Sequence, residues 1–328
     1  MATRFGVWNE YGRLREVAVG TTDGIVVPSF SPAYPPEIQA LTRAHEGKPL
    51  LDVEGFETIL QAVQAELDHL AETYRRLGVI VHRPRPYTDA ERDFLSSLQR
   101  GAYQLYPADP IWIIGRHAIE CQFRQPVRNK EVFPLRELIA PLIAADADAR
   151  VAACPMSAPL IGGGGAGPRL EGGDIFICGN DTKDILVGID EERSSSAAGV
   201  EWLGRYLYDD GYRVTGVPIT RDAPIHLLGA LGAVGPECAL IYRPSLLNGI
   251  PKPLRTWDLI DITLEEAKAT GPCLVMIDPQ TILVPAQLPR IAEELAKRSL
   301  EVIPIPFASV SRFDGGIRCA TFVMRRDA

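Results

Sequence analysis

The apolar residues of this chain recur with helical spacing in several stretches, and short apolar runs stand beside them. Between residues 56 and 77 the spacing predicts a helix with one buried face, formed by Ile59, Leu60, Val63, Leu67, Leu70 and Tyr74. A strand is predicted next at 79–81, and it ends before Pro84 because proline cannot continue a strand ladder. Residues 15–20 alternate like a half-buried strand, and a long loop is expected from Gly20 to Pro36.

Similar elements follow along the rest of the chain. We predict strands at 111–114, 212–217 and 301–304, helices at 132–145, 201–208 and 289–300, and hairpins at 175–187 and 274–284. This alternation predicts an α/β protein built from repeated strand–helix units. The hairpins argue against an all-parallel sheet, and no linker divides residues 1–328, so a single domain is expected.

Composition and charge narrow the classes of partner. The net charge of -8 leaves no broad basic surface for nucleic acid or an anionic membrane, so a small-molecule partner is expected. The amino terminus shows no leader pattern and no stretch reaches membrane-spanning length, which predicts a cytoplasmic protein. The six cysteines contain no Cys-x-x-Cys pair, so the sequence predicts neither a zinc site nor a disulfide scaffold. The glycine-rich tract 162–167 lacks the ending of a phosphate-binding P-loop, and a mobile loop is expected there.

Cys319 is the candidate nucleophile. It follows Gly315 and Gly316, which allow the backbone to approach a ligand closely, and it stands beside Arg318, whose charge would favour a thiolate. Taken alone, the same cysteine could be a small packing residue at the head of a terminal strand.

Three other segments hold possible partners for this cysteine. Asp109 lies between two prolines at the start of a strand, and Glu171 and Asp174 flank two glycines at the mouth of another. His226 lies in an apolar run. Each has a structural interpretation of its own: a turn cap for the aspartate, a glycine turn for the acidic pair, and a satisfied core residue for the histidine.

The order of these four segments resembles the guanidino-group-modifying enzymes of the pentein superfamily, which include arginine deiminases, dimethylarginine hydrolases and amidinotransferases. The resemblance extends over nearly the whole chain, because residues 9–17 resemble the family's opening strand and residues 314–321 its nucleophile strand. It implies a five-bladed, pseudo-symmetric α/β propeller of repeated strand–helix units, with the site at its centre. It implies no cofactor and no metal, and it allows a homodimer.

The resemblance also implies a role for each residue. Asp109 would receive the planar, cationic guanidinium, and Cys319 would attack its central carbon. His226 would act as general acid and base, oriented by Glu171. Asp174 would either contact a substrate nitrogen or brace its turn. For an amino-acid substrate, Arg128 ranks first as the carboxylate anchor, ahead of the two other candidates, Arg124 and Arg318.

Some positions depart from the family pattern. Leu228 stands where arginine deiminases and amidinotransferases usually carry an aspartate, which puts free arginine in doubt as the substrate. The segment Glu171–Asp174 resembles the hydrolases, whereas residues 20–28 resemble the amidinotransferases. Cys273 stands where many relatives have asparagine, and it is expected to be a packing residue.

These observations predict a cysteine-dependent enzyme that attacks a guanidino or amidino carbon through a covalent thio-intermediate. The leading prediction is a hydrolase, in which water completes the reaction. One alternative is an amidinotransferase, in which an amine acceptor completes it. The other is a catalytically silent protein that binds guanidino ligands or a protein partner.

Overall fold

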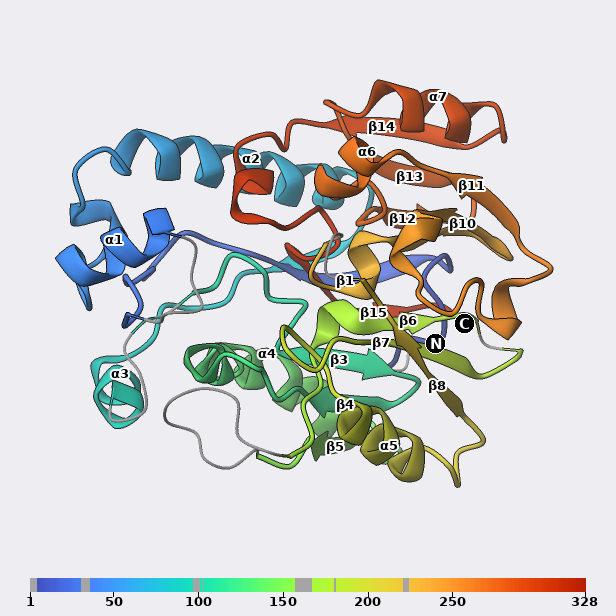
Figure 1. The fold of residues 1–328 in the computed structure, drawn as a ribbon, viewed down its shortest axis with the longest axis horizontal. Helices are drawn as coiled ribbons and strands as arrows, with labels where there is room; N and C mark the ends of the chain where they lie inside the picture. The colour runs from blue at the N-terminus through green and yellow to red at the C-terminus, as the bar shows by residue number, and fades with distance from the viewer. Residues whose placement is uncertain are drawn as a thin grey trace.

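The computed structural model describes residues 5–30, 36–96, 101, 103–156, 167–179, 181–220 and 224–328. Within these ranges the strands form five three-stranded sheets of one pattern (Figure 1). In each sheet the middle strand is antiparallel to one neighbour and parallel to the other. The chain is therefore a five-bladed α/β propeller, as predicted. Every described sheet contains both parallel and antiparallel pairs, which confirms the prediction that the strands are not all parallel.

The first sheet joins the two ends of the chain. Its middle strand β1 (Leu14–Val19) pairs antiparallel with β15 (Thr321–Arg326) and parallel with β2 (Ile80–His82). The other sheets each use consecutive strands: β3 (Ile111–Ile114), β4 (His117–Glu120) and β5 (Arg150–Ala153); β6 (Ile175–Ile177), β7 (Asp184–Ile189) and β8 (Arg213–Pro218); β9 (Leu231–Gly235), β10 (Cys238–Ile241) and β11 (Asp258–Asp261); β12 (Val275–Asp278), β13 (Thr281–Pro285) and β14 (Glu301–Ile305).

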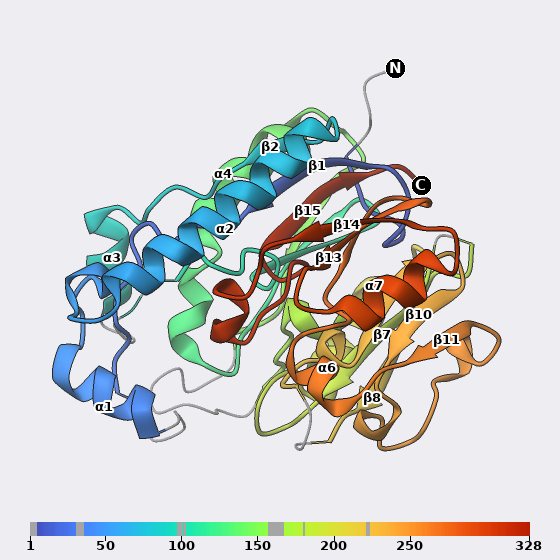
Figure 2. The same ribbon diagram turned by 90° about the horizontal axis from the view of Figure 1, so that it is seen from above.

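Helices occupy the crossovers between parallel strands. In four units an α-helix lies between the middle strand and its parallel neighbour: α2 (Glu57–Arg76), α4 (Phe133–Ala144), α5 (Ala197–Tyr206) and α7 (Pro289–Ala296). In the β9–β11 unit two short 3-10 helices, Arg243–Ser245 and Lys252–Leu254, take this place. The remaining described α-helices are α1 (Pro36–His45), α3 (Asp89–Ser96) and α6 (Leu264–Lys268). Figure 1 shows α2, α5 and α7 at the periphery of the strands, and Figure 2 shows the same for α2 and α7.

The predicted helix between residues 56 and 77 is α2, and five of its six predicted apolar residues are fully or almost fully buried; Ile59 is partly buried. The helix packs on β1 and β2 with this face. The hairpins are confirmed as β6–β7 and β12–β13. In the second hairpin, the Asp278 carboxylate accepts hydrogen bonds from the backbone of Gln280 and Thr281, which fixes the turn.

Several boundaries differ from the prediction; helix α7, for example, ends at Ala296 rather than at Leu300. Helix α5 begins four residues earlier than expected, because the Ser196 hydroxyl accepts a hydrogen bond from the Gly199 amide and caps it. The last strand begins at Thr321, so Cys319 lies in the turn before the strand rather than within it. Residues 162–166 of the glycine-rich tract lie outside the described residues. Among the described helices, none combines the length and apolar character needed to cross a bilayer.

Candidate active site

In each sheet, the turn before the outer strand that runs antiparallel to the middle strand carries the candidate residues. Asp109 lies two residues before Ile111, where β3 begins, and Cys319 lies two residues before Thr321, where β15 begins. The corresponding positions in the other sheets are Gly173 before β6, Gly229 before β9 and Cys273 before β12. Each of the five units therefore contributes the equivalent turn, just before its outer antiparallel strand, to the candidate site.

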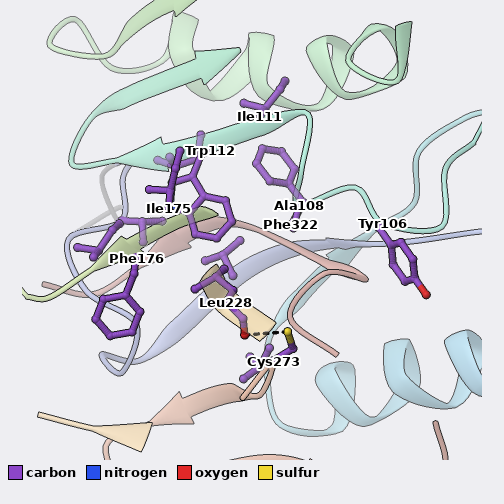
Figure 3. Close-up of a cluster of buried hydrophobic side chains, with 14 of the residues drawn as sticks. Tyr106, Ala108, Ile111, Trp112, Ile175, Phe176, Leu228, Cys273 and Phe322 are labelled. Carbon is purple, nitrogen blue, oxygen red and sulfur yellow. Dashed lines mark hydrogen bonds between the residues drawn. The ribbon is translucent and has the colours of Figure 1, made fainter. Parts of the chain in front are cut away.

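Five hydrogen bonds join these turns into a closed ring. Each runs from one turn to the next: Ala108 N to Cys319 O at 3.2 Å, Gly172 N to Asp109 O at 3.1 Å, Leu227 N to Asp174 Oδ1 at 3.0 Å, Cys273 Sγ to Leu228 O at 3.1 Å, and Arg318 N to Cys273 O at 3.0 Å. Figure 3 shows the link between Cys273 and Leu228 within the surrounding apolar side chains. The ring brings together four candidate segments that are far apart in sequence.

The two glycines between Glu171 and Asp174 allow neighbouring turns to approach closely. A Cβ atom on Gly172 would lie 2.7 Å from the Asp109 carbonyl oxygen, and one on Gly173 would lie 2.5 Å from Nδ1 of His226. Both distances are shorter than van der Waals contact permits. The His226 ring therefore rests directly on the backbone of Gly173.

Glu171 orients His226 from the opposite side of the ring. Its Oε2 lies 2.7 Å from Nε2 of His226, and its Oε1 accepts a hydrogen bond of 2.8 Å from the backbone amide of Arg124. Burial of the imidazole disfavours its charged form, but the carboxylates of Asp174 and Glu171 outweigh burial and raise the pKa of His226 to about 10. The histidine is thus held as an imidazolium at neutral pH.

Asp174 has the contacts of a bracing residue. Its Oδ2 accepts hydrogen bonds from the amide and the hydroxyl of Ser195, at 3.2 and 2.7 Å, and its Oδ1 accepts one from the amide of Leu227. The side chain is fully buried, and burial raises its pKa. Of the two roles expected for Asp174, these contacts correspond to bracing, because they fix the turn that carries His226.

Within the described ranges, Asp109 has one carboxylate oxygen that is paired and one that is not. Its Oδ2 accepts a hydrogen bond of 3.0 Å from Arg128, whereas Oδ1 is buried and has no hydrogen-bond partner among the described residues. A buried carboxylate oxygen without a donor is costly, so this atom is a natural acceptor for the N–H groups of a cationic ligand.

Arg128 is shared between two buried carboxylates. Besides Asp109 it donates to both oxygens of Glu131, and its guanidinium stacks over the ring of Phe123, with its central carbon 4.3 Å from the ring centroid. Burial raises the pKa of Glu131 to about 7, although Arg128 opposes this shift. These contacts position Asp109 and differ from those of the expected carboxylate anchor. For Arg124, by contrast, no side-chain ion pair occurs among the described residues.

Cys319 is partly exposed and adjoins a second thiol. Its Sγ lies 3.9 Å from Sγ of Cys273, which is buried. The pKa of Cys319 is lowered, chiefly by hydrogen bonding with Cys273, with further contributions from the Gly316 backbone and His226; burial and Asp109 oppose this shift. A cation bound at Asp109 would weaken that opposition and favour the thiolate.

Arg318 was expected to favour the Cys319 thiolate, but its guanidinium has other partners. It stacks over Trp112, with its central carbon 4.1 Å from the ring centroid, and donates to Glu10 at 3.1 Å. The glycines before Cys319 also serve a different purpose from the one expected. A Cβ on Gly315 would collide with the Tyr106 ring, and one on Gly316 with Cys273, so the glycines make room for protein atoms rather than for a ligand.

Sequence reasoning missed the contribution of Ser195, Glu131 and Cys273 to the site. For Cys273 a signal existed, since it precedes β12 by the same two residues that separate Cys319 from β15. Ser195 and Glu131 carry no comparable local signal. Within the described part of the chain, no group of three or more His, Cys, Asp or Glu residues could hold a metal ion.

No protein-family model matches the chain, but its sequence is similar over nearly its whole length to amidinotransferases. The chain is 23% identical to the L-arginine:L-lysine amidinotransferase of Pseudomonas savastanoi pv. phaseolicola, over 97% of this chain and 93% of the relative. It is 25% identical to inosamine-phosphate amidinotransferase 1 of Streptomyces glaucescens, over 98% and 96%.

Solved structures show the same fold. The inosamine-phosphate amidinotransferase StrB1 of Streptomyces griseus matches with a TM-score of 0.78 and 21% identity, over 99% of this chain and 98% of that chain. A dimethylarginine dimethylaminohydrolase of Pseudomonas aeruginosa matches with a TM-score of 0.64 and 18% identity, over 94% and 99%. The fold is therefore shared with transferases and hydrolases, while the sequence relatives favour the transferase alternative over the leading hydrolase prediction.

Proposed function

Because this chain is a member of the pentein superfamily by its fold and by its full-length similarity to amidinotransferases, we propose that it transfers an amidino group from a guanidino donor to an amine acceptor. The observation that carries the proposal is Oδ1 of Asp109, which has no hydrogen-bond partner in the described part of the chain and belongs to the same ring of turns as Cys319 and the Glu171–His226 pair. This arrangement combines a cation acceptor, a nucleophile and a proton donor.

The first half-reaction begins when the donor guanidinium binds Asp109. Charge neutralisation at Asp109 favours the Cys319 thiolate, which attacks the central guanidino carbon to form a tetrahedral adduct. The imidazolium of His226 gives its proton to the departing amine as the C–N bond breaks. An amidino group remains bound to the sulfur through a C–S bond, and His226 is left neutral.

The second half-reaction reverses these roles. The neutral His226 accepts a proton from the incoming amine, whose nitrogen attacks the amidino carbon, and the C–S bond breaks to release the new guanidine and the thiolate. Glu171 stabilises the imidazolium that forms again. Asp174 holds the turn of His226, and Arg128 holds Asp109, so both act as positioning residues in this proposal.

Hydrolysis is the second candidate, and Leu228 favours it. This buried leucine follows His226 by two residues, so the turn offers no second carboxylate at the point where the resemblance to transferases predicts one. In this reaction water takes the place of the amine acceptor, and the first half-reaction is unchanged.

Product analysis tests both candidates. The purified protein is incubated with arginine and substituted arginines, each with and without lysine, glycine or an amino-sugar acceptor, and the products are identified by mass spectrometry. A new guanidine that forms only with acceptor, together with the amine released from the donor, supports transfer. Citrulline or urea formed without acceptor supports hydrolysis and refutes the transfer proposal. Loss of every product in Cys319→Ser, with the fold retained, is expected in either case.

A further inference from the structure

A second thiol lies beside the proposed nucleophile, in the equivalent turn of the neighbouring unit. Cys273 precedes β12 as Cys319 precedes β15, and the two sulfur atoms are 3.9 Å apart. The backbones are tied together as well, because the amide of Arg318 donates to the Cys273 carbonyl at 3.0 Å. Gly316 has no room for a side chain because Cys273 fills that space. The proximity of the two thiols is thus a property of two anchored turns.

The two thiols differ in accessibility. Cys319 is partly exposed, whereas Cys273 is only 3% exposed and donates to the carbonyl of Leu228 at 3.1 Å (Figure 3). A dissolved oxidant therefore reaches Cys319 first. The other four cysteines lie outside the five central turns, after β4, after β5, after β6 and in β10.

We propose that Cys273 is a resolving thiol, which forms a disulfide with Cys319 after a hydroperoxide has oxidised Cys319, and so blocks the site reversibly. The inference rests on the proposed function only in taking Cys319 as the reactive thiolate. It adds a site of oxidative modification to the amidino-transfer chemistry.

The chemistry proceeds in two balanced steps. The Cys319 thiolate attacks the peroxide O–O bond, which breaks to give Cys319 sulfenic acid and hydroxide or alkoxide. The sulfur of Cys273 then attacks the sulfenic sulfur, an S–S bond forms, and the S–O bond breaks with release of water, whose second hydrogen comes from the Cys273 thiol. The pair of thiols loses two electrons, and the peroxide gains them.

The geometry allows this bond with a small movement. A disulfide requires sulfur atoms about 2 Å apart, so the 3.9 Å separation must fall by roughly 2 Å.

The disulfide would remove the function of both sulfurs. The nucleophile would be consumed, and the Cys273–Leu228 link in the ring of turns would be lost as the Cys273 sulfur moves toward Cys319. Reduction by a dithiol would restore both. A cysteine that only packs in the core would leave Cys319 to oxidise further, to the sulfinic and sulfonic acids, from which a dithiol recovers nothing.

Peptide mapping of the oxidised protein tests the inference. Reduced full-length protein is treated with a small excess of hydrogen peroxide, digested without reductant and analysed by mass spectrometry. We expect a cross-linked peptide that joins Cys273 to Cys319, and a loss of turnover that dithiothreitol reverses. Cys273→Ser is expected to give Cys319 sulfinic acid and a loss that dithiothreitol does not reverse. Cys238→Ser, which removes a partly exposed thiol outside the ring, is expected to behave as the unmodified protein.

The outcomes separate this inference from the proposed function. Sulfinic acid at Cys319 in the unmodified protein, without the cross-link, would overturn the resolving role even if Cys319→Ser were inactive. A cross-link in a protein whose Cys319→Ser variant still turns over would support the thiol pair and overturn the proposed nucleophile. The mapping of the unmodified protein decides the question even if Cys273→Ser does not fold.

Discussion

Nε2 of His226 lies 2.7 Å from Oε2 of Glu171, and the opposite side of the same ring rests on the backbone of Gly173. The two contacts fix both the charge and the orientation of the imidazole. The protonated ring can therefore serve as the general acid of the first half-reaction, a role that a neutral histidine could not fill.

Glu171→Gln is expected to move the basic limb of the pH–rate profile to lower pH. The active form requires the Cys319 thiolate, whose pKa is lowered, together with the His226 imidazolium, whose pKa is about 10. Activity should therefore rise as the thiol ionises and fall as pH approaches 10. Loss of the carboxylate lowers the pKa of His226, so the fall should begin earlier.

Steady-state kcat/KM across the pH range measures this shift. Glu120→Gln provides the matched control, because Glu120 pairs with Arg136 at the end of β4, outside the ring of turns. A basic limb that stays in place in Glu171→Gln would show that Glu171 does not maintain the charge of His226.

The same pair should make stability depend on pH. The folded pKa of His226 lies above the unfolded value of 6.5, so its contribution to stability is complete below pH 6.5 and is lost as pH rises through about 10. The difference in unfolding free energy between the unmodified protein and Glu171→Gln should shrink over that interval. Urea titrations at several pH values measure it, and a difference independent of pH would contradict the assignment.

Asp109→Asn should separate the reactivity of the cysteine from turnover. The Asp109 carboxylate opposes ionisation of Cys319, so its neutralisation should lower the pKa of the thiol and speed its alkylation by iodoacetamide at mildly acidic pH. The same change removes the acceptor for the guanidinium, so turnover of guanidino donors should fall.

In Asp109→Asn the rate of alkylation should rise while the rate of turnover falls. Alkylation is followed by intact mass across pH, and turnover by product formation. Asp184→Asn, which removes a carboxylate paired with Arg213 in β8, controls for the loss of a negative charge elsewhere. Slower alkylation together with unchanged turnover would exclude Asp109 from both roles.

Periodicity in the sequence predicted the amphipathic helix α2 and both hairpins, because their apolar positions are numerous and regular. It did not predict β9, a five-residue buried strand with two glycines, or β5, a four-residue strand with three exposed positions. Such strands are defined by their neighbours in the sheet, and a single sequence holds no record of that pairing.

The candidate site also has features that the sequence predicted and features that it did not. The resemblance carried by the order of the four segments pointed to Asp109, Glu171, His226 and Cys319, and the ring of turns brings their segments together; their catalytic roles stay predictions. Adjacency in sequence was misleading for Arg318, because its guanidinium stacks over Trp112 and donates to Glu10. Cys273 and Cys319 are 46 residues apart in sequence, so the fold is needed to bring the two thiols together.

Gly173→Ala should impair catalysis by displacing His226. The added methyl carbon would lie 2.5 Å from Nδ1 of the ring, so the ring must move away from Gly173 and cannot keep its present contact with Glu171. We expect a fall in kcat, a lower pKa of His226 in an NMR titration, and a destabilisation of roughly 1–3 kcal/mol from overpacking.

Gly204→Ala is the matched control for this substitution. Gly204 lies within α5, where a Cβ atom would meet the Val214 side chain at an ordinary 3.7 Å. Alanine is a better helix former than glycine, so the control should be stabilised by up to about 1 kcal/mol and should keep its kcat. If Gly173→Ala kept both its kcat and the pKa of His226, the close approach of the ring to the backbone would have no catalytic importance, and the turn would tolerate a side chain that its geometry excludes.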